Sequence, residues 1–263
     1  MAISIIVMGA AGRMGTNIAR LVEAAEDLTL AAVIERPEAE AGLAAYVARG
    51  ILASCSLAEV LPKCPGAVII DFTAPEATMA NTRAAVAAGC PIVIGTTGFS
   101  DEQLAELNEL AAKGPVFRSA NMSVGINAVM GILPQLTAKL GEDYDIEMTE
   151  IHHNKKKDAP SGTALLLAEP LLEARGMDKA DINTNRFDVR EPRRHDEIGI
   201  QSLRGGDVVG VHTIYYLGTG ESIEITHRAQ SRENFAAGAI RAARWLVSQK
   251  PGRLYSLQDV LNS

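Results

Sequence analysis

The chain has 263 residues and 47% of them are hydrophobic, so it is long enough to bury the core of one large domain or of two modest ones. Its formal net charge of −7 argues against nucleic-acid binding, which needs a basic surface. The 3 cysteines match neither a disulfide framework nor a zinc motif, and no apolar run is long enough to span a membrane. We therefore expect a soluble cytoplasmic protein that is not associated with a membrane.

The first half of the chain alternates short apolar runs with stretches of helical periodicity. Such runs are typical of buried parallel strands, which we expect at residues 3–8, 29–34, 67–70, 92–94 and 116–119. Helices are expected at residues 17–25, 75–89 and 100–113, and residues 38–50 are expected to be helical or irregular. This alternation predicts an α/β fold, namely a Rossmann-type doubly wound parallel sheet with helices on both faces.

The pattern changes after residue 121, where an apolar helix to about residue 140 is followed by an alternating strand at 145–152. A helix is expected at 163–174, a long charged loop at 178–197, and a final helix from Ser231 to Leu246. Three further strands are expected at 198–203, 208–217 and 222–229. We expect the tight links at 204–207 and 218–220 to make these strands neighbours in a hairpin-linked sheet.

These elements predict two domains. The dinucleotide-binding domain is expected at residues 1–123, with residues 233–263 packing back on it. The second domain, at residues 124–232, is expected to be an α+β domain with a mixed sheet that binds substrate. A cleft between two such domains is the default place for a ligand.

Gly9, Gly12 and Gly15 lie between the first predicted strand and the helix that follows it. A dinucleotide site needs a tight turn, close approach of the backbone to the pyrophosphate, and free N–H groups at a helix N-terminus. Glu35 ends the second predicted strand, where a carboxylate accepts hydrogen bonds from a ribose, and Arg13 lies where it can meet a phosphate. Glycine-rich turns also serve plain helix–strand packing, so this motif alone leaves both interpretations open.

Glu35 and Arg36 bear on the choice of coenzyme. A carboxylate favours NADH, whereas an adjacent Arg pairs with the 2′-phosphate of NADPH, so with both present we expect use of NADH and NADPH. The alternative is that Glu35 and Arg36 form only a solvated charge pair at the end of the strand. Gly95-Thr96-Thr97-Gly98 ends the fourth strand and either holds the nicotinamide carboxamide or forms only a tight turn. The same choice holds for residues 71–73 and 119–122.

Residues 150–163 concentrate charged and polar side chains before a helix. His152 and His153 are consecutive, so they point to opposite sides, and a histidine is the best general acid at neutral pH. Adjacent histidines do not readily bind one ion and no third ligand is suitably spaced, which argues against a metal. The lysines at 155–157 are either a solvated loop or part of an anion site, in which the helix start at Ser161-Gly162-Thr163 takes part.

These motifs resemble those of the 4-hydroxy-tetrahydrodipicolinate reductase (dihydrodipicolinate reductase) family. The resemblance spans nearly the whole chain in order and is most specific at residues 150–164. The residues that carry it are Val7 to Gly15, Asp71-Phe72-Thr73, Gly95 to Gly98, Asn121 to Gly125, Glu150 to His153, Lys156, Asp158 to Ala164, Thr226 to Ala229, Ser231-Arg232 and Phe235-Ala236.

The resemblance implies that His152 is the proton donor and that Lys156 is a partner acid that also fixes the substrate. It implies that the two substrate carboxylates are held by His153, Lys156, Ser161, Gly162 and Thr163. It implies that NADH or NADPH is bound by Gly9, Ala10, Ala11, Gly12, Arg13, Met14, Glu35, Arg36, Gly95, Thr96, Thr97, Ser119, Ala120, Asn121 and Met122. Members of the family reduce a cyclic imine dicarboxylate at C4 with loss of water, in the diaminopimelate–lysine pathway, and form homotetramers through the sheets of the second domain.

Two other functions remain open at this point. One is a different two-domain nicotinamide enzyme, such as an amino-acid or semialdehyde dehydrogenase. The semialdehyde type needs a cysteine nucleophile, and Cys55, Cys64 and Cys90 lie outside any activating motif. The other is a non-catalytic dinucleotide-sensing module, which would not need residues 150–163.

Overall fold

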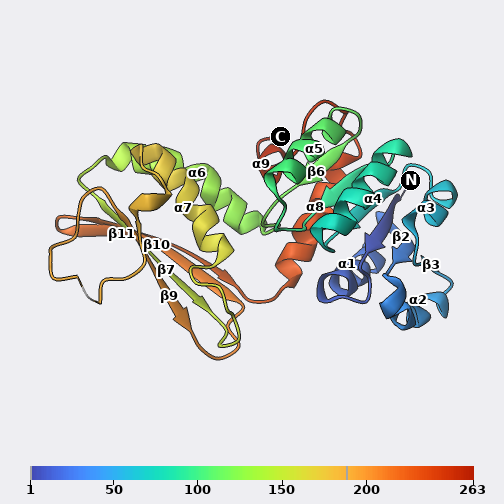
Figure 1. Ribbon diagram of the computed structural model, residues 1–263, viewed down its shortest axis with the longest axis horizontal. Coiled ribbons are helices and arrows are strands. Elements are labelled where there is room, and N and C mark those ends of the chain that lie inside the picture. Colours follow the sequence, from blue (N-terminus) through green and yellow to red (C-terminus); the bar gives the residue numbers. More distant parts are fainter. Residues whose placement is uncertain (1, 188) are drawn as a thin grey trace. The chain divides into compact units, whose positions relative to one another are not determined.

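The computed structural model describes residues 2–187 and 189–263, and the chain forms two compact units (Figure 1). Unit 1 comprises Met1–Val124 together with Arg232–Ser263, and unit 2 comprises Gly125–Ser231. In the described part of the chain, no helix has both the length and the apolar character needed to cross a membrane.

Unit 1 is built on a parallel sheet of six strands in the order β3-β2-β1-β4-β5-β6. The strands are β1 (Ile3–Met8), β2 (Leu28–Ile34), β3 (Leu52–Ser54), β4 (Val68–Asp71), β5 (Ile92–Ile94) and β6 (Val116–Arg118). The prediction of a Rossmann-type sheet is confirmed. The predicted set of five strands is incomplete, because β3 adds an edge strand beside β2. Its three residues are only half-buried, too few to show a periodicity of their own.

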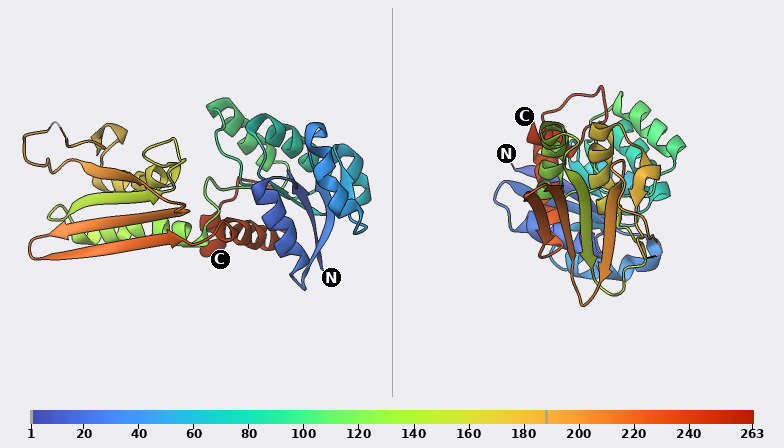
Figure 2. Two further views of the ribbon diagram at one scale, coloured as in Figure 1. Left: turned by 90° about the horizontal axis from the view of Figure 1, so that it is seen from below. Right: turned by 90° about the vertical axis from the view of Figure 1, so that its left-hand side faces the viewer.

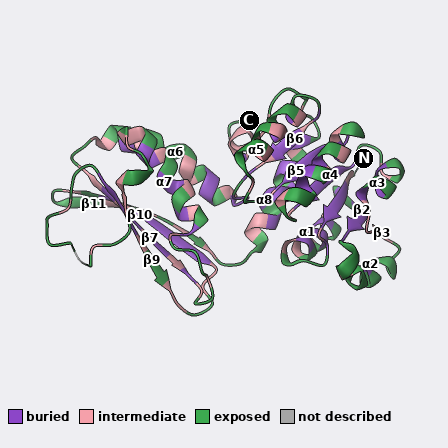
Figure 3. Cartoon of the chain, in the orientation of Figure 1, coloured by how far each residue is buried: buried purple, intermediate pink, exposed green. Residues whose placement is uncertain are grey.

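Helices cover both faces of this sheet. They are α1 (Arg13–Glu23), α2 (Ala44–Val47), α3 (Leu57–Val60), α4 (Pro75–Ala87), α5 (Asp101–Ala111), α8 (Glu233–Leu246) and α9 (Leu257–Leu261), with the 3-10 turns η1 (Pro37–Leu43) and η2 (Leu61–Lys63). Successive residues of β1 point to opposite faces, so Ile5 and Val7 join the core beneath α1 and α8, whereas Ile6 and Met8 join the core beneath α4 and α5. Buried residues accordingly concentrate in the strands (Figure 3).

Helix α8 returns the end of the chain to unit 1. It packs against α1, and an ideal Cβ on Gly238 would lie 1.8 Å from the carbonyl oxygen of Met122. Glycine is therefore required where α8 meets the segment after β6. The helix begins at Glu233 with Arg232 as its N-cap, so the predicted cap at Ser231 is wrong by one residue.

Unit 2 contains a mixed sheet of five strands in the order β11-β10-β7-β9-β8. The strands are β7 (Asp145–His152), β8 (Ile182–Asn183), β9 (Ile198–Arg204), β10 (Gly210–Gly218) and β11 (Glu221–Ala229). Helices α6 (Val124–Leu140) and α7 (Gly162–Arg175) lie on one face of this sheet, and among the described residues of unit 2 no helix covers the other face (Figure 2). Apart from the 3-10 turn η3 (Lys179–Asp181) and β8, the predicted loop at 178–197 is irregular in its described residues; residue 188 lies outside them.

The predicted neighbours in this sheet are only partly right. Strands β10 and β11 form the expected antiparallel hairpin. Strand β9 does not pair with β10, because β7 lies between them, parallel to β9 and antiparallel to β10. Residues 205–209 cross two strand spacings, about 10 Å, which is well within the reach of five extended residues. The glycines at 205 and 206 thus mark a crossing over β7, not a two-residue turn.

Candidate active site

The glycine loop of unit 1 is a tight turn held by its own backbone. Gly9 adopts a φ of 65°, which favours glycine. Ala10 N–H donates to the Ile34 carbonyl at 3.1 Å, which ties the loop to the end of β2. An ideal Cβ on Gly15 would lie 2.1 Å from the Gly9 carbonyl oxygen, so the start of α1 touches the loop directly. The loop therefore serves close helix–strand packing and also leaves backbone open to a ligand.

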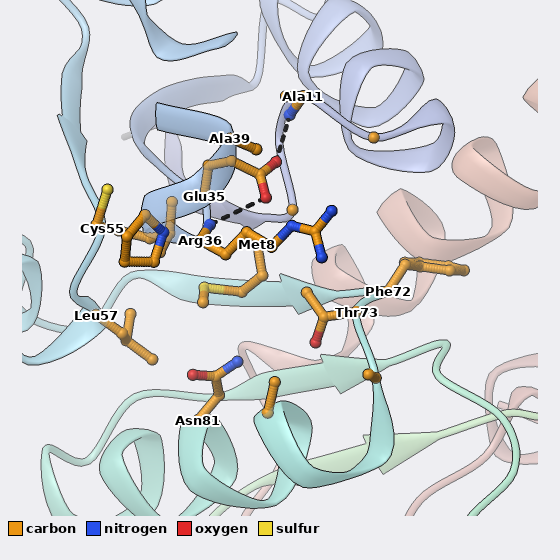
Figure 4. A pocket seen from close by; sticks show the side chains of 16 residues that line it. Met8, Ala11, Glu35, Arg36, Ala39, Cys55, Leu57, Phe72, Thr73 and Asn81 are labelled. Atoms are coloured by element: carbon orange, nitrogen blue, oxygen red, sulfur yellow. Dashed lines mark hydrogen bonds between the residues drawn. The ribbon is translucent and has the colours of Figure 1, made fainter. Parts of the chain in front are cut away.

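A cavity of about 600 Å³ opens beside this loop (Figure 4). The predicted coenzyme residues that line it are Gly9, Ala11, Gly12, Glu35 and Arg36. The other lining residues are Met8, Ile34, Pro37, Ala39, Cys55, Leu57, Phe72, Thr73, Ala74, Ala77 and Asn81. Phe72 and Thr73 belong to a segment that the sequence indicates. Sequence reasoning missed Pro37 and Ala39 of η1, Cys55 after β3, Leu57 of α3, and Ala77 and Asn81 of α4, because they carry no motif.

Glu35 is held against the glycine loop. Its Oε2 accepts a hydrogen bond from Ala11 N–H at 2.9 Å, and its Oε1 accepts one from Arg36 N–H at 3.0 Å. A carboxylate has about four acceptor positions, so these two bonds leave capacity for hydroxyl donors in the cavity. Figure 4 shows Glu35 on one side of the cavity and Asn81 on the other. The loop, the acid and the cavity together fit the ribose and phosphate part of a nicotinamide dinucleotide.

Asp71 joins two of the predicted coenzyme segments. Its side chain is fully buried, and Oδ1 accepts hydrogen bonds from the Thr73 N–H at 2.9 Å and the Thr73 hydroxyl at 2.6 Å. Asn81 donates to Oδ2 at 2.8 Å, and Thr78, a further donor to Oδ1, lies 2.8 Å from the hydroxyl of Thr96. The turns after β4 and β5 are therefore parts of a single network. The turn at Ser119 is fixed to the end of β5 by its N–H, which donates to the Ile94 carbonyl at 3.1 Å.

Not every predicted coenzyme residue faces the cavity. The residues that do not line it are Ala10, Arg13, Met14, Gly95, Thr96, Thr97, Ser119, Ala120, Asn121 and Met122. Ala10 and Met122 are buried, and Met14 packs against the hydrophobic core. Gly95 to Thr97 and Ser119 to Met122 follow β5 and β6, at the carboxyl edge where ligands bind to such sheets.

In unit 2, a buried carboxylate organises the end of β7. Glu150 is 0% exposed, and its Oε2 lies 2.6 Å from Nδ1 of His152. Arg204 donates to both carboxylate oxygens, at 2.8 and 2.7 Å, and Ser161 N–H donates to Oε1 at 3.1 Å. The alternating burial of β7 agrees with the alternation expected at residues 145–152 and places Glu150 and His152 on the inner face of the strand. Strand register then brings Arg204 opposite His152.

The charge of Glu150 determines which ring nitrogen of His152 carries a hydrogen. Burial raises the pKa of Glu150, but its hydrogen bonds, above all that from Arg204, outweigh this effect and lower the pKa to about 2. An ionised carboxylate only accepts hydrogen bonds, so Nδ1 of His152 must carry a hydrogen and Nε2 is left for other chemistry. Burial lowers the pKa of His152, and the opposing effect of Glu150 offsets this only in part. The charged ring is therefore a stronger acid than a free imidazole, which favours donation of its proton.

In the loop after β7, the three lysines at 155–157 have different surroundings. Lys156 is partly buried and its Nζ lies 2.8 Å from the carboxylate of Asp158, whereas Lys155 and Lys157 are exposed. Lys156 N–H donates to the His153 carbonyl at 3.1 Å. The structure thus distinguishes Lys156 from its neighbours by its burial and by its contact with Asp158.

Ser161 is the N-cap of α7. Its hydroxyl accepts a hydrogen bond from Ala164 N–H at 3.1 Å and lies 3.1 Å from Nε2 of His212. A Cβ added to Gly162 would meet nothing within 4 Å, so the helix start is open on that side, and Thr163 is half-buried. A helix N-terminus beside a lysine is a suitable place for a carboxylate.

Sequence reasoning gave no role to Glu150, Arg204 or His212. The alternation of β7 is a signal for Glu150, because it shares the inner face with His152. Arg204 and His212 lie on β9 and β10, and only the strand pairing brings them to Glu150 and His152. Across residues 2–187 and 189–263, no group of three or more His, Cys, Asp and Glu side chains is arranged to hold a metal ion.

Comparisons with known proteins agree with this architecture. A family profile described as "Dihydrodipicolinate reductase, N-terminus" matches residues 3–122, and one described as "Dihydrodipicolinate reductase, C-terminus" matches residues 125–261. The 4-hydroxy-tetrahydrodipicolinate reductase of Oleidesulfovibrio alaskensis is 56% identical over 262 residues, which cover 99% of this chain and 100% of that protein. That of Nitratidesulfovibrio vulgaris is also 56% identical, over 261 residues with the same coverage.

Solved structures share the fold. The dipicolinate-bound dihydrodipicolinate reductase from Paenisporosarcina sp. TG-14 matches with a TM-score of 0.78 at 24% identity, over 97% of this chain and 98% of that chain. A myo-inositol dehydrogenase from Corynebacterium glutamicum matches with a TM-score of 0.63 at 16% identity, over 100% of this chain and 93% of that chain. The profiles cover both parts of the chain and the relatives match it from end to end, so the chain belongs to the dihydrodipicolinate reductase family.

Proposed function

We propose that this chain reduces 4-hydroxy-tetrahydrodipicolinate to tetrahydrodipicolinate with NADH or NADPH, in the diaminopimelate route to lysine. The observation that carries the proposal is the buried Glu150–His152 pair beside the open start of α7, in a chain 56% identical over its length to reductases of that name. A proton donor next to an anion site is what reduction of a dicarboxylate imine requires.

Unit 1 is proposed to hold the coenzyme. The glycine loop faces the pyrophosphate, Glu35 accepts the ribose hydroxyls, and Arg36 meets a 2′-phosphate when one is present. The turns at 95–97 and 119–122 hold the nicotinamide end. When bound, the reduced nicotinamide supplies a hydride to C4 of the substrate, whose 4-hydroxyl departs as water.

Unit 2 is proposed to hold and protonate the substrate. His152 donates a proton from Nε2 to the anion that hydride addition leaves on the substrate. Glu150 keeps Nδ1 protonated and stabilises the charged ring. Lys156 is the partner acid and pairs with a substrate carboxylate, which requires it to exchange its present contact with Asp158. The other contacts to the two carboxylates come from His153, Ser161, Gly162 and Thr163.

The remaining features of the proposal concern domains, assembly and location. Residues 1–123 with 233–263 form the coenzyme domain, and residues 124–232 form the substrate domain. A homotetramer assembled through the second sheet is supported by its face without helices, where Leu203 and Leu217 are exposed. A cytoplasmic location is supported by the free thiols of Cys55, Cys64 and Cys90.

The direct test is oxidation of NADH and NADPH with freshly generated synthase product as substrate. We expect turnover by the wild-type protein, and about a hundredfold to ten-thousandfold lower kcat for His152→Gln, which removes the general acid. The Kd for NADPH, measured by fluorescence titration, should be unchanged. Absence of turnover with either coenzyme refutes the proposed function, and an active His152→Gln variant refutes the role of the acid.

Glu150→Gln should move the alkaline limb of the kcat/KM pH profile to lower pH. The Glu150 carboxylate raises the pKa of His152, so its neutralisation lowers that pKa and reduces the protonated fraction at any given pH. The exposed Glu224 on β11 offers a control with the same change of charge. If the profile of Glu150→Gln superimposes on those of wild type and Glu224→Gln, then Glu150 does not control the pKa of the catalytic acid.

Lys156→Ala should raise KM for the substrate about tenfold or more, because a charge-assisted contact to a carboxylate is lost, and it should also lower kcat. Lys155→Ala and Lys157→Ala provide matched controls, since both side chains are exposed neighbours. Steady-state kinetics of the three variants measure KM and kcat for comparison. Equal effects in all of them would assign the contribution to general positive charge instead of Lys156.

Glu35→Ala should weaken NADH binding about tenfold or more and NADPH binding less. Both coenzymes lose an acceptor for ribose, but removing the carboxylate also relieves its repulsion of a 2′-phosphate. Titration with each coenzyme measures the two affinities, and the exposed Glu38→Ala is the control. Equal losses for both coenzymes contradict the assignment of Glu35 to the ribose.

A further inference from the structure

His212 is a buried titratable group that the proposed mechanism does not use. It lies on β10 with 5% of its surface exposed, and its Nε2 is 3.1 Å from the hydroxyl oxygen of Ser161. Its ring meets that of His152 edge-on, with centroids 5.1 Å apart. It therefore touches the proposed acid and the cap of α7 at the same time.

His212 is neutral near pH 7. Burial is the main reason why its pKa falls to about 4, and the neighbouring His152 lowers it further. A neutral imidazole has a hydrogen on one ring nitrogen and a lone pair on the other. The direction of the hydrogen bond with Ser161 therefore depends on which tautomer is present.

The surroundings of the ring favour the tautomer with its hydrogen on Nε2. Nδ1 of His212 is buried and has no hydrogen-bond partner among the described residues. A buried donor without a partner is rarer in proteins than an acceptor without one. The hydrogen therefore belongs on Nε2, where the Ser161 oxygen accepts it, and Nδ1 keeps its lone pair.

This arrangement determines what the Ser161 hydroxyl can do. Its oxygen accepts from Ala164 N–H and from Nε2 of His212, which uses both lone pairs. The hydroxyl hydrogen must then point away from these two donors. The open space beside Gly162 lies at the same helix start.

We propose that His212 is a positioning residue that holds the Ser161 hydroxyl as a hydrogen-bond donor to an anion bound at the start of α7. The identification of that anion as a substrate carboxylate rests on the proposed function. Without the imidazole, the hydroxyl is free to donate elsewhere or to rotate, and it must be reoriented whenever the anion binds. His212 thus contributes to the affinity for the anion, while His152 contributes to the chemical step.

The first experiment measures dipicolinate binding by calorimetry, since a structural relative binds this dicarboxylate. We expect His212→Phe to weaken binding about tenfold, because it removes a donor to Ser161 and so a hydrogen bond to a charged group. His212→Gln, whose amide nitrogen can replace Nε2, should restore affinity to within about threefold of wild type. Ser161→Ala should weaken binding to a similar extent, and the double variant Ser161→Ala, His212→Phe should bind no worse than either single variant.

The kinetic counterpart is a higher KM for His212→Phe with kcat nearly unchanged. Wild-type affinity in His212→Phe overturns the proposal. So does additive weakening in the double variant, because the two side chains would then act independently.

A second measurement observes the tautomer directly and does not depend on ligand affinity. Solid-state nitrogen-15 NMR of histidine-labelled protein reports the tautomer of each of the 5 histidines, and His212→Gln identifies the signal of His212. A hydrogen on Nε2 and a bare Nδ1 are expected, and the opposite tautomer overturns the proposal. The two proposals can fail separately: an active enzyme with the opposite tautomer refutes only the role of His212, whereas an inactive protein that shows the expected tautomer and binding losses refutes only the proposed reaction.

Discussion

The second unit depends on one buried carboxylate. Burying an ion without partners costs several kcal/mol, so Glu150 is tolerated only because Arg204, His152 and the Ser161 N–H all bond to it. Those partners come from β9, from β7 itself and from the start of α7. The same contacts that make the charge tolerable fix the tautomer of the proposed acid and the position of the proposed anion site. Stability and function therefore rest on the same atoms.

The first unit uses carboxylates in a similar way. Asp71 at the end of β4 gathers Thr73, Thr78 and Asn81, and Glu35 at the end of β2 receives the N–H of Ala11. In both units the acids stand at or near the carboxyl ends of strands, where backbone and polar side chains emerge from an apolar sheet. An acid in that place orders several turns at once.

The two buried histidines of unit 2, His152 and His212, have different hydrogen-bond partners and different proposed roles. His152 is paired with a carboxylate, which stabilises its charged form, whereas His212 is paired with a hydroxyl and stays neutral. Two rings in edge contact thus have different hydrogen-bonding roles because their partners differ. One neighbouring pair of imidazoles can therefore serve both proton transfer and orientation of a neutral donor.

The sequence by itself determined the local pattern: the parallel Rossmann sheet, the glycine loop with Glu35, the alternation that puts Glu150 beside His152, and the capped start of α7. These follow from periodicity, caps and turns, which act over a few residues. The tertiary structure alone decided that β7 separates β9 from β10, and that Arg204 and His212 reach Glu150 and His152. Short strands such as β3, and partners more than fifty residues apart, are selected by burial and strand register across the whole fold, and no local pattern specifies them.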